Sequence, residues 1–514
     1  MSGTGTARTL AAADWAVIVA FFATLVALGV VCARRQKSSD QFFGGDKSMP
    51  WYLAGVSFYM CTFSALAFVM YSALAYKFGF VPVTVSWLLV PAIFLGAQFT
   101  AVRWRRVAKS SPLDFAEERF GNRMRQSLLW LGIPMRVLDD AFKLLAIGTV
   151  VGIGLGFPLD RAIVLCGAIV IAYTFLGGLK ATLVADFVQF LVLFSVVLAL
   201  PFFCLARTGG FANFVARAPE GFFSLTAGKY TWLYMVVLFS ISLVNRCTSW
   251  PLVQRYYSTR SEKDAKKVGY LVALLLFIGP PLFFLPAMTA RVFMPGLDMN
   301  DANVMNGVYA SVCLEVLPAG MVGMVIAAMF SATMSTLAGD FNAVSSVLTN
   351  DFYVRMLAPA SSARRKLVAA RAATALVGAL VIALTFVMRN AQGADDLLNV
   401  TNKMFSVFVP PIALPTVVGL LCRRVPRSAG VAGLYAGIAV GTAMFIAGAG
   451  CPVLREMIVM TPITFLATAL GMAVAARWRP DTPEDARVVD LFFRASTITV
   501  PKQVIQFIKR HHIQ

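Results

Sequence analysis

The chain has 514 residues, of which 59% are apolar and only 14% are charged, whereas about 25% of the residues of an ordinary soluble domain are charged. A bilayer core about 30 Å thick needs roughly 20 mostly apolar residues per helix, and the many such runs in this chain exclude a soluble enzyme, a disordered protein and a small secreted scaffold. A net charge of +20 can indicate nucleic acid, but these basic residues lie in short loops between apolar runs, so no nucleic-acid partner is expected.

Hydropathy and turn signals predict thirteen transmembrane helices. They run approximately over residues 13–33, 50–76, 79–101, 126–155, 161–178, 183–206, 231–254, 268–290, 319–349, 366–388, 398–422, 429–449 and 454–477. The stretches between them reach only about 20–30 residues, which is too short for a soluble catalytic domain. We therefore expect an all-α integral membrane protein that is not an enzyme. The function classes that fit such a protein are a transporter and a channel.

The basic residues of the loops predict the orientation, because cytoplasmic loops carry an excess of Lys and Arg. Most loop cations, among them Arg103, Arg105, Arg255 and Arg260, fall on the cytoplasmic side if the N-terminus is outside. We therefore expect a plasma or inner membrane location, with the N-terminus outside and the C-terminus in the cytoplasm. The tail from residue 489 to 514 mixes apolar and basic residues, so it either lies on the inner leaflet or is solvated.

Charged residues inside the predicted spans are functional candidates, because a charge at membrane depth is costly. They are Arg136, Asp139, Asp140, Lys143, Asp186, Arg246, Asp340 and Lys403. In the span 126–155, Arg136 with Asp140 and Asp139 with Lys143 stand at i,i+4 spacing. Mutual neutralisation within that helix is therefore the alternative to a functional role.

Two spans combine hydroxyl and small residues in otherwise apolar sequence. In the span 319–349, Ser335, Thr336 and Asp340 share one helix face. The span 50–76 carries Ser57, Thr62 and Ser64. Hydroxyls together with freed backbone carbonyls are hard oxygen donors that suit an alkali cation. Hydroxyls in membrane helices also commonly bond to their own backbone, so the pattern by itself leaves both readings open.

Four motifs, in chain order, resemble the sodium:solute symporter family. They are FFGGDKSMPWYLAGVS (42–57), YTFLGGLKATLVADFVQ (173–189), WPLVQRYYSTRSEKDAKK (250–267) and AAMFSATMSTLAGDFNAVSSVLTNDFY (327–353). The resemblance covers about residues 10–450. It implies a sodium-coupled transporter that imports a small polar solute by alternating access, with Na⁺ as the bound ion. A channel and a membrane sensor are the alternatives from other classes.

The resemblance also implies the architecture. The family has a LeuT-like core of five plus five helices, related by an inverted repeat, with two broken helices at its centre. Residues 1–40 would then be an extra N-terminal span, and 41–425 the transport core, divided into halves 41–207 and 229–425. Residues 426–480 would be extra C-terminal spans and 481–514 a cytoplasmic tail.

The sodium ligands are likewise implied by the resemblance. They would be the backbone carbonyls of Met60, Phe63 and Ala332 and the hydroxyls of Ser335 and Thr336. Some members have a second sodium site. This chain keeps its acidic residue, Asp186, but has Ala338 and Gly339 in place of its hydroxyls.

Asp340 departs from the family pattern, and three explanations are open. It could pair with a basic side chain such as Arg136, Lys143 or Arg246. It could form a replacement second cation site with Asp186. It could also be protonated, because burial disfavours the charged form.

The candidate solute ligands are Thr62, Ser64, Ser86, Arg136, Asn245 and Arg246. Arg136 aligns with the arginine that holds the carboxylate in sialic acid transporters of the family, and its planar fork suits a carboxylate. We therefore expect an organic anion or a sugar acid such as sialic acid. If Asp140 neutralises Arg136, a neutral sugar, amino acid or vitamin-like solute is the alternative. Besides the solute and the lipid bilayer, no obligate protein partner is expected.

Overall fold

The computed structural model describes residues 11–33, 42–43, 48–62, 65–107, 113–390 and 397–497. Over these ranges the chain is almost entirely helical and forms no strand longer than an isolated bridge, as expected for an all-α protein. The expected sodium ligand Phe63 and the expected solute ligand Ser64 lie outside the described residues.

The helices follow the expected spans closely. From the N-terminus to residue 217 they are α1 (Ala12–Ala33), α3 (Trp51–Met60), α4 (Ala65–Phe78), α5 (Val81–Trp87), α6 (Leu89–Phe99), α7 (Ala101–Val107), α8 (Asp114–Phe120), α9 (Asn122–Leu155), α10 (Leu159–Thr208) and α11 (Phe211–Arg217). From residue 232 to residue 421 they are α12 (Trp232–Thr248), α13 (Trp250–Ser258), α14 (Glu262–Phe293), α15 (Ala302–Val316), α16 (Met321–Val347), the π-helix η2 (Leu348–Leu357), α17 (Ala363–Asn390) and α18 (Leu397–Leu421). The chain continues with α19 (Arg427–Ala447), the 3-10 helix η3 (Pro452–Arg455), α20 (Met457–Trp478) and α21 (Pro483–Thr497).

Within the described ranges, nine helices are long and apolar enough to cross a membrane, and the bent pair α12–α13 makes a possible tenth. The expected number of thirteen is not confirmed. The 50 residues of α10 hold two of the expected spans, 161–178 and 183–206, and a kink at Gly178 divides α10 into two helices at the expected boundary.

Two helices are interrupted near the centre of the molecule. The first expected interruption separates α3, which ends at Met60, from α4, which begins at Ala65. The second separates α12 from α13, and these two helices meet at an angle of 49°. Ser249 has φ −57° and ψ 124° at this junction, and Pro251 lies in the first turn of α13, where its missing N–H costs no helical hydrogen bond.

A third irregularity lies inside α10, where Gly178 has φ 53° and ψ −164°. We expect Gly178→Ala to lower the thermal unfolding temperature in detergent, because a side chain at positive φ costs about 1–2 kcal/mol and its Cβ would lie 2.7 Å from the Phe42 carbonyl oxygen. Gly156→Ala is the matched control, since Gly156 has φ 68° and open space around its Cβ position. An equal loss in both variants would show that contact with Phe42 adds nothing.

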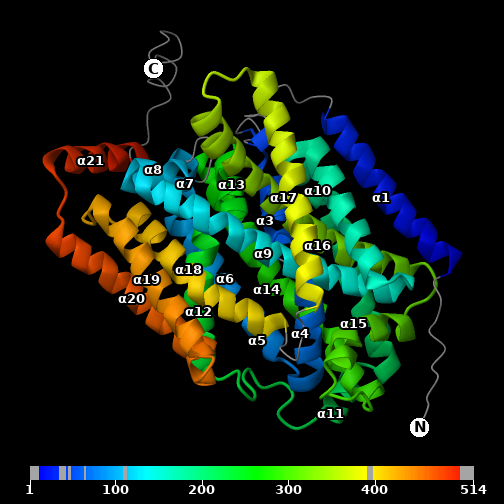
Figure 1. The fold of residues 1–514 in the computed structure, drawn as a ribbon. Coiled ribbons are helices and arrows are strands. Elements are labelled where there is room, and N and C mark those ends of the chain that lie inside the picture. Colours follow the sequence, from blue (N-terminus) through cyan, green and yellow to red (C-terminus); the bar gives the residue numbers. More distant parts are fainter. Residues whose placement is uncertain are drawn as a thin grey trace.

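Helix α16 lies at the core of the fold and is buried along nearly all of its length (Figure 1). It packs against α1, α9, α10 and α17. Asp14 of α1 is buried, and its Oδ1 accepts hydrogen bonds from the backbone N–H groups of Gly320 and Gly323, both at 2.8 Å. This carboxylate satisfies donors at the α16 N-terminus that the helix itself leaves unpaired.

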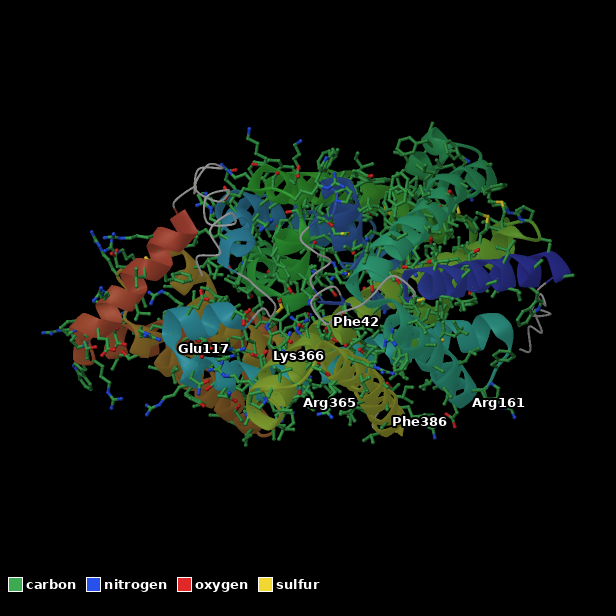
Figure 2. All side chains as sticks on the ribbon, turned by 90° about the horizontal axis from the view of Figure 1, so that it is seen from above. Phe42, Glu117, Arg161, Arg365, Lys366 and Phe386 are labelled. Carbon is green, nitrogen blue, oxygen red and sulfur yellow. The ribbon has the colours of Figure 1, made fainter. Side chains whose placement is uncertain are left out.

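The two ends of the molecule are distinct. Helices α7, α8, α13 and α21 gather at one end, and α5, α11 and α15 at the other (Figure 1). Seen from above, α21 and α1 lie at opposite edges (Figure 2). The apolar residues Val489, Phe492 and Phe493 of α21 are buried, and Phe492 packs on Phe115 of α8. One face of this first part of the C-terminal tail is therefore packed on the protein.

Candidate functional site

A cavity of about 220 Å³ lies where the two interrupted helices meet. Cys61 and Thr62 line it at the α3–α4 break, and Ser249 and Pro251 line it at the α12–α13 junction. Helices α4, α9, α12, α16 and α18 contribute most of the remaining wall. Its charged lining residues are Arg136, Asp139, Lys143, Arg246 and Asp340. A mostly apolar wall with a few convergent polar groups is typical of a small-molecule site.

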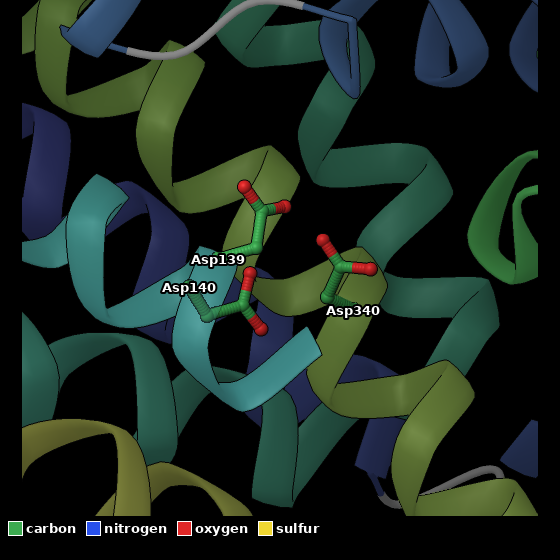
Figure 3. Close-up of side chains that lie close together, drawn as sticks. All are labelled: Asp139, Asp140 and Asp340. Carbon is green, nitrogen blue, oxygen red and sulfur yellow. The ribbon is translucent and has the colours of Figure 1, made fainter. Parts of the chain in front are cut away.

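Four of these charged side chains belong to one ion-pair network between α9 and α16. The Oδ1 of Asp340 lies 2.5 Å from Arg136 Nη1, and its Oδ2 lies 2.9 Å from Lys143 Nζ. Lys143 also pairs with Asp139 at 2.7 Å and with Asp140 at 3.0 Å. Figure 3 shows the three carboxylates facing one another, and their oxygens lie within 4.8 Å. In this network, three carboxylates form ion pairs with only two cations, Arg136 and Lys143.

This network corrects one expectation about the span 126–155. The expected pair of Asp139 with Lys143 is present, whereas that of Arg136 with Asp140 is not found. Arg136 reaches across to Asp340 on α16 instead, and its Nη2 donates to Ser249 Oγ at 3.2 Å. Asp340 thus has two basic partners. Of the three explanations for this residue, the structure agrees with the first, pairing with basic side chains.

Two of the expected sodium ligands that the structure describes, Met60 and Ser335, lie at or next to the α3–α4 break. The Cys61 thiol lies 3.5 Å from the Ser335 carbonyl oxygen and 3.7 Å from the Ser335 hydroxyl, so the end of α3 contacts α16 at that residue. The Thr336 hydroxyl donates to the Ala332 carbonyl at 3.0 Å, which brings two further expected ligands together. A hydrogen bond from a hydroxyl to the carbonyl of its own helix is also what a hydroxyl without a sodium role makes, so this contact fits both explanations.

A second buried ion pair lies beside this break. Asp186 of α10 and Arg255 of α13 are both fully buried, with 3.7 Å between Oδ2 and Nη2. Arg255 Nε donates to Ser57 Oγ at 3.1 Å, Nη2 donates to Cys61 Sγ at 3.1 Å, and the Ser57 hydroxyl donates to Asp186. Asp186 and Asp340 therefore each have basic partners of their own. The assignment of Arg255 to a cytoplasmic loop was wrong.

Arg255 also gives a physical reason for the glycine at position 339. A Cβ on Gly339 would lie 3.1 Å from Arg255 Nη2 and 3.0 Å from Cys61 Sγ. Contacts this short require a neighbour to move. The guanidinium group thus occupies space next to the position at which a hydroxyl side chain was expected.

The expected solute ligands are only partly brought together. Thr62, Arg136, Asn245 and Arg246 line the cavity. Ser86 is buried on α5 but does not line it. Arg246 forms no ion pair with any described residue, and its Nε is buried without a hydrogen-bond partner there. Of the three cations in the wall, Arg246 is thus the one that forms no ion pair with a described carboxylate, although Asp139 and Asp340 are close enough to interact with its charge.

The model of the sodium:solute symporter family matches residues 42–437. The chain belongs to this family. The sodium/sialic acid symporter NanT of Aliivibrio fischeri is 25% identical over 452 residues, which cover 84% of this chain and 88% of the relative. The sodium/glucose cotransporter of Vibrio parahaemolyticus is 24% identical over 520 residues and 93% of each chain. The structure of a Na⁺-coupled sialic acid symporter in a substrate-bound outward-open state superposes with TM-score 0.81 and 20% identity, over 91% of this chain and 98% of that one.

These findings confirm several expectations. This symporter is a multi-pass membrane transporter of a small solute, coupled to Na⁺, and not an enzyme. The superposition confirms the all-α LeuT-like fold.

Ser249 and Trp250 were not predicted as partners of Arg136, whose guanidinium carbon lies 5.3 Å from the centre of the Trp250 ring. Both residues precede Pro251, so the proline was the available signal of a helix junction at this point. The buried contacts of Asp14 and Arg255 were not predicted either. Arg255 stands between apolar and aromatic residues in VQRYY, which is a poor context for a loop cation.

Proposed function

We propose that this symporter couples inward sodium movement to uptake of a small organic anion, and that the acid group of the solute binds to Arg246. The observation that carries the proposal is the Arg246 guanidinium in the cavity wall, which forms no ion pair with a described carboxylate and whose buried Nε has no hydrogen-bond partner among the described residues. A buried cation is costly unless it is paired, so a carboxylate in the cavity would gain both a charge partner and a planar hydrogen-bonding fork. The named substrates of the sialic acid symporters support a sugar acid as the first candidate.

Arg136 is the less suitable anion ligand, although it lines the same cavity. Its Nη1 is paired with Asp340 and its Nη2 donates to Ser249. A solute carboxylate would have to compete with Asp340 for this side chain. Arg136 would then position the network beside the solute, with Thr62 and Asn245 as neutral donors and acceptors in the wall.

For the coupling ion, we propose that Na⁺ binds between the α3–α4 break and α16, held by Met60, Phe63, Ala332, Ser335 and Thr336. The contact of Cys61 with Ser335 supports this position. Because the cavity begins at the same break, sodium binding would order part of its wall. Coupling is reciprocal, so the solute must raise sodium affinity by the factor by which sodium raises solute affinity.

The proposed topology has the N-terminus outside and the C-terminus in the cytoplasm. The proposed transport core is 41–425, with 1–40 and 426–480 as additional spans. Helices α7, α8, α13 and α21 gather at one end of the molecule, and the loops next to them are rich in arginine. This supports the placement of that end in the cytoplasm.

Arg246→Gln tests the solute assignment. We expect the KM for N-acetylneuraminate, or for the best sugar acid in a thermal-shift screen with NaCl or KCl, to rise by roughly 10-fold to 100-fold, because a charge-assisted hydrogen bond is lost from a buried site. Arg246→Lys keeps the charge without the fork and should recover only part of the affinity.

Arg136→Lys is the matched variant in the same cavity and should change the KM less than Arg246→Lys. The reverse order would move the acid group to Arg136. Saturable sodium-dependent uptake of neutral sugars alone, unaffected by Arg246→Gln, would contradict an anionic solute. Unsaturable conductance would indicate a channel, and binding without flux would indicate a sensor.

A further inference from the structure

A groove of about 790 Å³ lies away from the central cavity, at the end of the molecule that holds α8 and α21. It is bounded by the α8–α9 connection, the start of α19 and the end of α20. Figure 2 shows α8, marked by Glu117, on the side of the molecule that also holds α21. Its polar wall includes Arg123, Arg427, Arg479 and Asp485, and its apolar wall includes Val474 and Trp478.

The charges of this groove are unbalanced. Arg427 is neutralised, because its Nη1 lies 3.3 Å from Asp485 Oδ1 and its backbone N–H donates to Asp481 at 2.7 Å. Arg123 and Arg479 are exposed, and neither forms an ion pair with a residue that the structure describes. Two guanidinium groups therefore face the groove with no counter-charge among those residues.

An exposed apolar stripe leads away from these two arginines along α20. Leu466, Leu470, Val474 and Trp478 follow one another at intervals of four residues, so they share one helix face. Their exposed fractions are 59%, 54%, 49% and 79%. The stripe is about 18 Å long, since an α-helix rises 1.5 Å per residue. Val474 and Trp478 line the groove, so stripe and basic end are continuous.

We propose that this groove binds one anionic glycerophospholipid, with its phosphate between Arg123 and Arg479 and an acyl chain along the stripe of α20. The charge pattern favours this occupant, because basic pockets beside membrane helices attract anionic headgroups. A free inorganic anion would use the arginines but leave the apolar stripe uncovered. Trp478, at the end of the stripe, has the amphipathic ring that is common where acyl chains meet headgroups.

The test is native mass spectrometry of the full chain in detergent, titrated with phosphatidylglycerol or phosphatidylcholine. We expect one phosphatidylglycerol to bind at least tenfold more tightly than phosphatidylcholine. Arg123→Gln with Arg479→Gln should weaken phosphatidylglycerol binding by roughly tenfold or more. Arg477→Gln with Arg487→Gln is the matched control, because it removes the same charge from exposed residues of α20 and α21 that do not line the groove.

Equal weakening in the two double variants would overturn the proposal, because general surface charge would then explain the binding. Unchanged binding in the Arg123 and Arg479 variant would overturn it as well. Competition by inorganic phosphate, together with no effect of Leu470→Gln, would indicate a small-anion site and would also overturn it. All four arginines are exposed, so the variants should fold, and a single symmetric peak in size-exclusion chromatography checks this.

Discussion

Replacing Ser335 with alanine is expected to raise the sodium concentration for half-maximal transport by about tenfold or more. Ser335 is fully buried on α16 and contacts Cys61 at the α3–α4 break. If its hydroxyl is a sodium ligand, the alanine variant leaves a dehydrated cation one oxygen short, and a lost buried ligand costs about 1–3 kcal/mol. Thr336→Ala should act in the same direction. Initial uptake rates across a sodium titration measure both effects.

Ser331→Ala is the matched control for Ser335→Ala. Ser331 lies one turn earlier on the same face of α16, is also fully buried, and donates to the Ala327 carbonyl at 2.7 Å. Its hydroxyl is satisfied by its own helix, so we expect sodium dependence to stay within about twofold of the original. Unchanged sodium dependence in both Ser335→Ala and Thr336→Ala would remove these residues from the sodium site, whatever the control does.

Hydropathy was sufficient to locate most helices, because a membrane span must satisfy its backbone hydrogen bonds internally and cover its surface with apolar side chains. The sequence motifs likewise predicted the interruption after Met60 and the helix that contains Ser335. The boundary between the spans 161–178 and 183–206 was accessible as well, because the kink that divides α10 lies at Gly178, the last residue of the first of these spans.

The partners of the buried charges were the hardest part to predict. Spacing within one helix identified the Asp139–Lys143 pair but also suggested Arg136 with Asp140, since both pairs stand at i,i+4. The observed partner of Arg136 is 204 residues away. Likewise, Arg255 was counted as a loop cation because its charge suggested solvent, whereas its ion pair with Asp186 comes from a helix that tertiary packing brings alongside. Sequence periodicity carries no information on such contacts.

Asp340→Asn is expected to destabilise the protein by about 3–5 kcal/mol, because it removes a buried charge on which two cations depend. Asp340 is 2% exposed and pairs with both Arg136 and Lys143. Lys143 would keep Asp139 and Asp140, but Arg136 would lose its carboxylate. The loss should therefore be partly restored by Arg136→Gln in the same chain, as thermal unfolding of the two single variants and the double variant can measure.

Asp139→Asn is the comparison that separates this network from a cation site. Asp139 contacts the same Lys143 but is more exposed, and Lys143 retains two other carboxylates without it, so we expect a smaller loss of stability. If Asp340 and Asp186 instead share a second sodium ion, Asp340→Asn should lower the Hill coefficient for sodium toward one while the unfolding temperature stays unchanged. If Asp340 is protonated, the substitution should remove a pH dependence of transport without changing that coefficient. Two cations already satisfy Asp340, so the result we expect is lost stability, rescue by Arg136→Gln, and an unchanged Hill coefficient in the rescued protein.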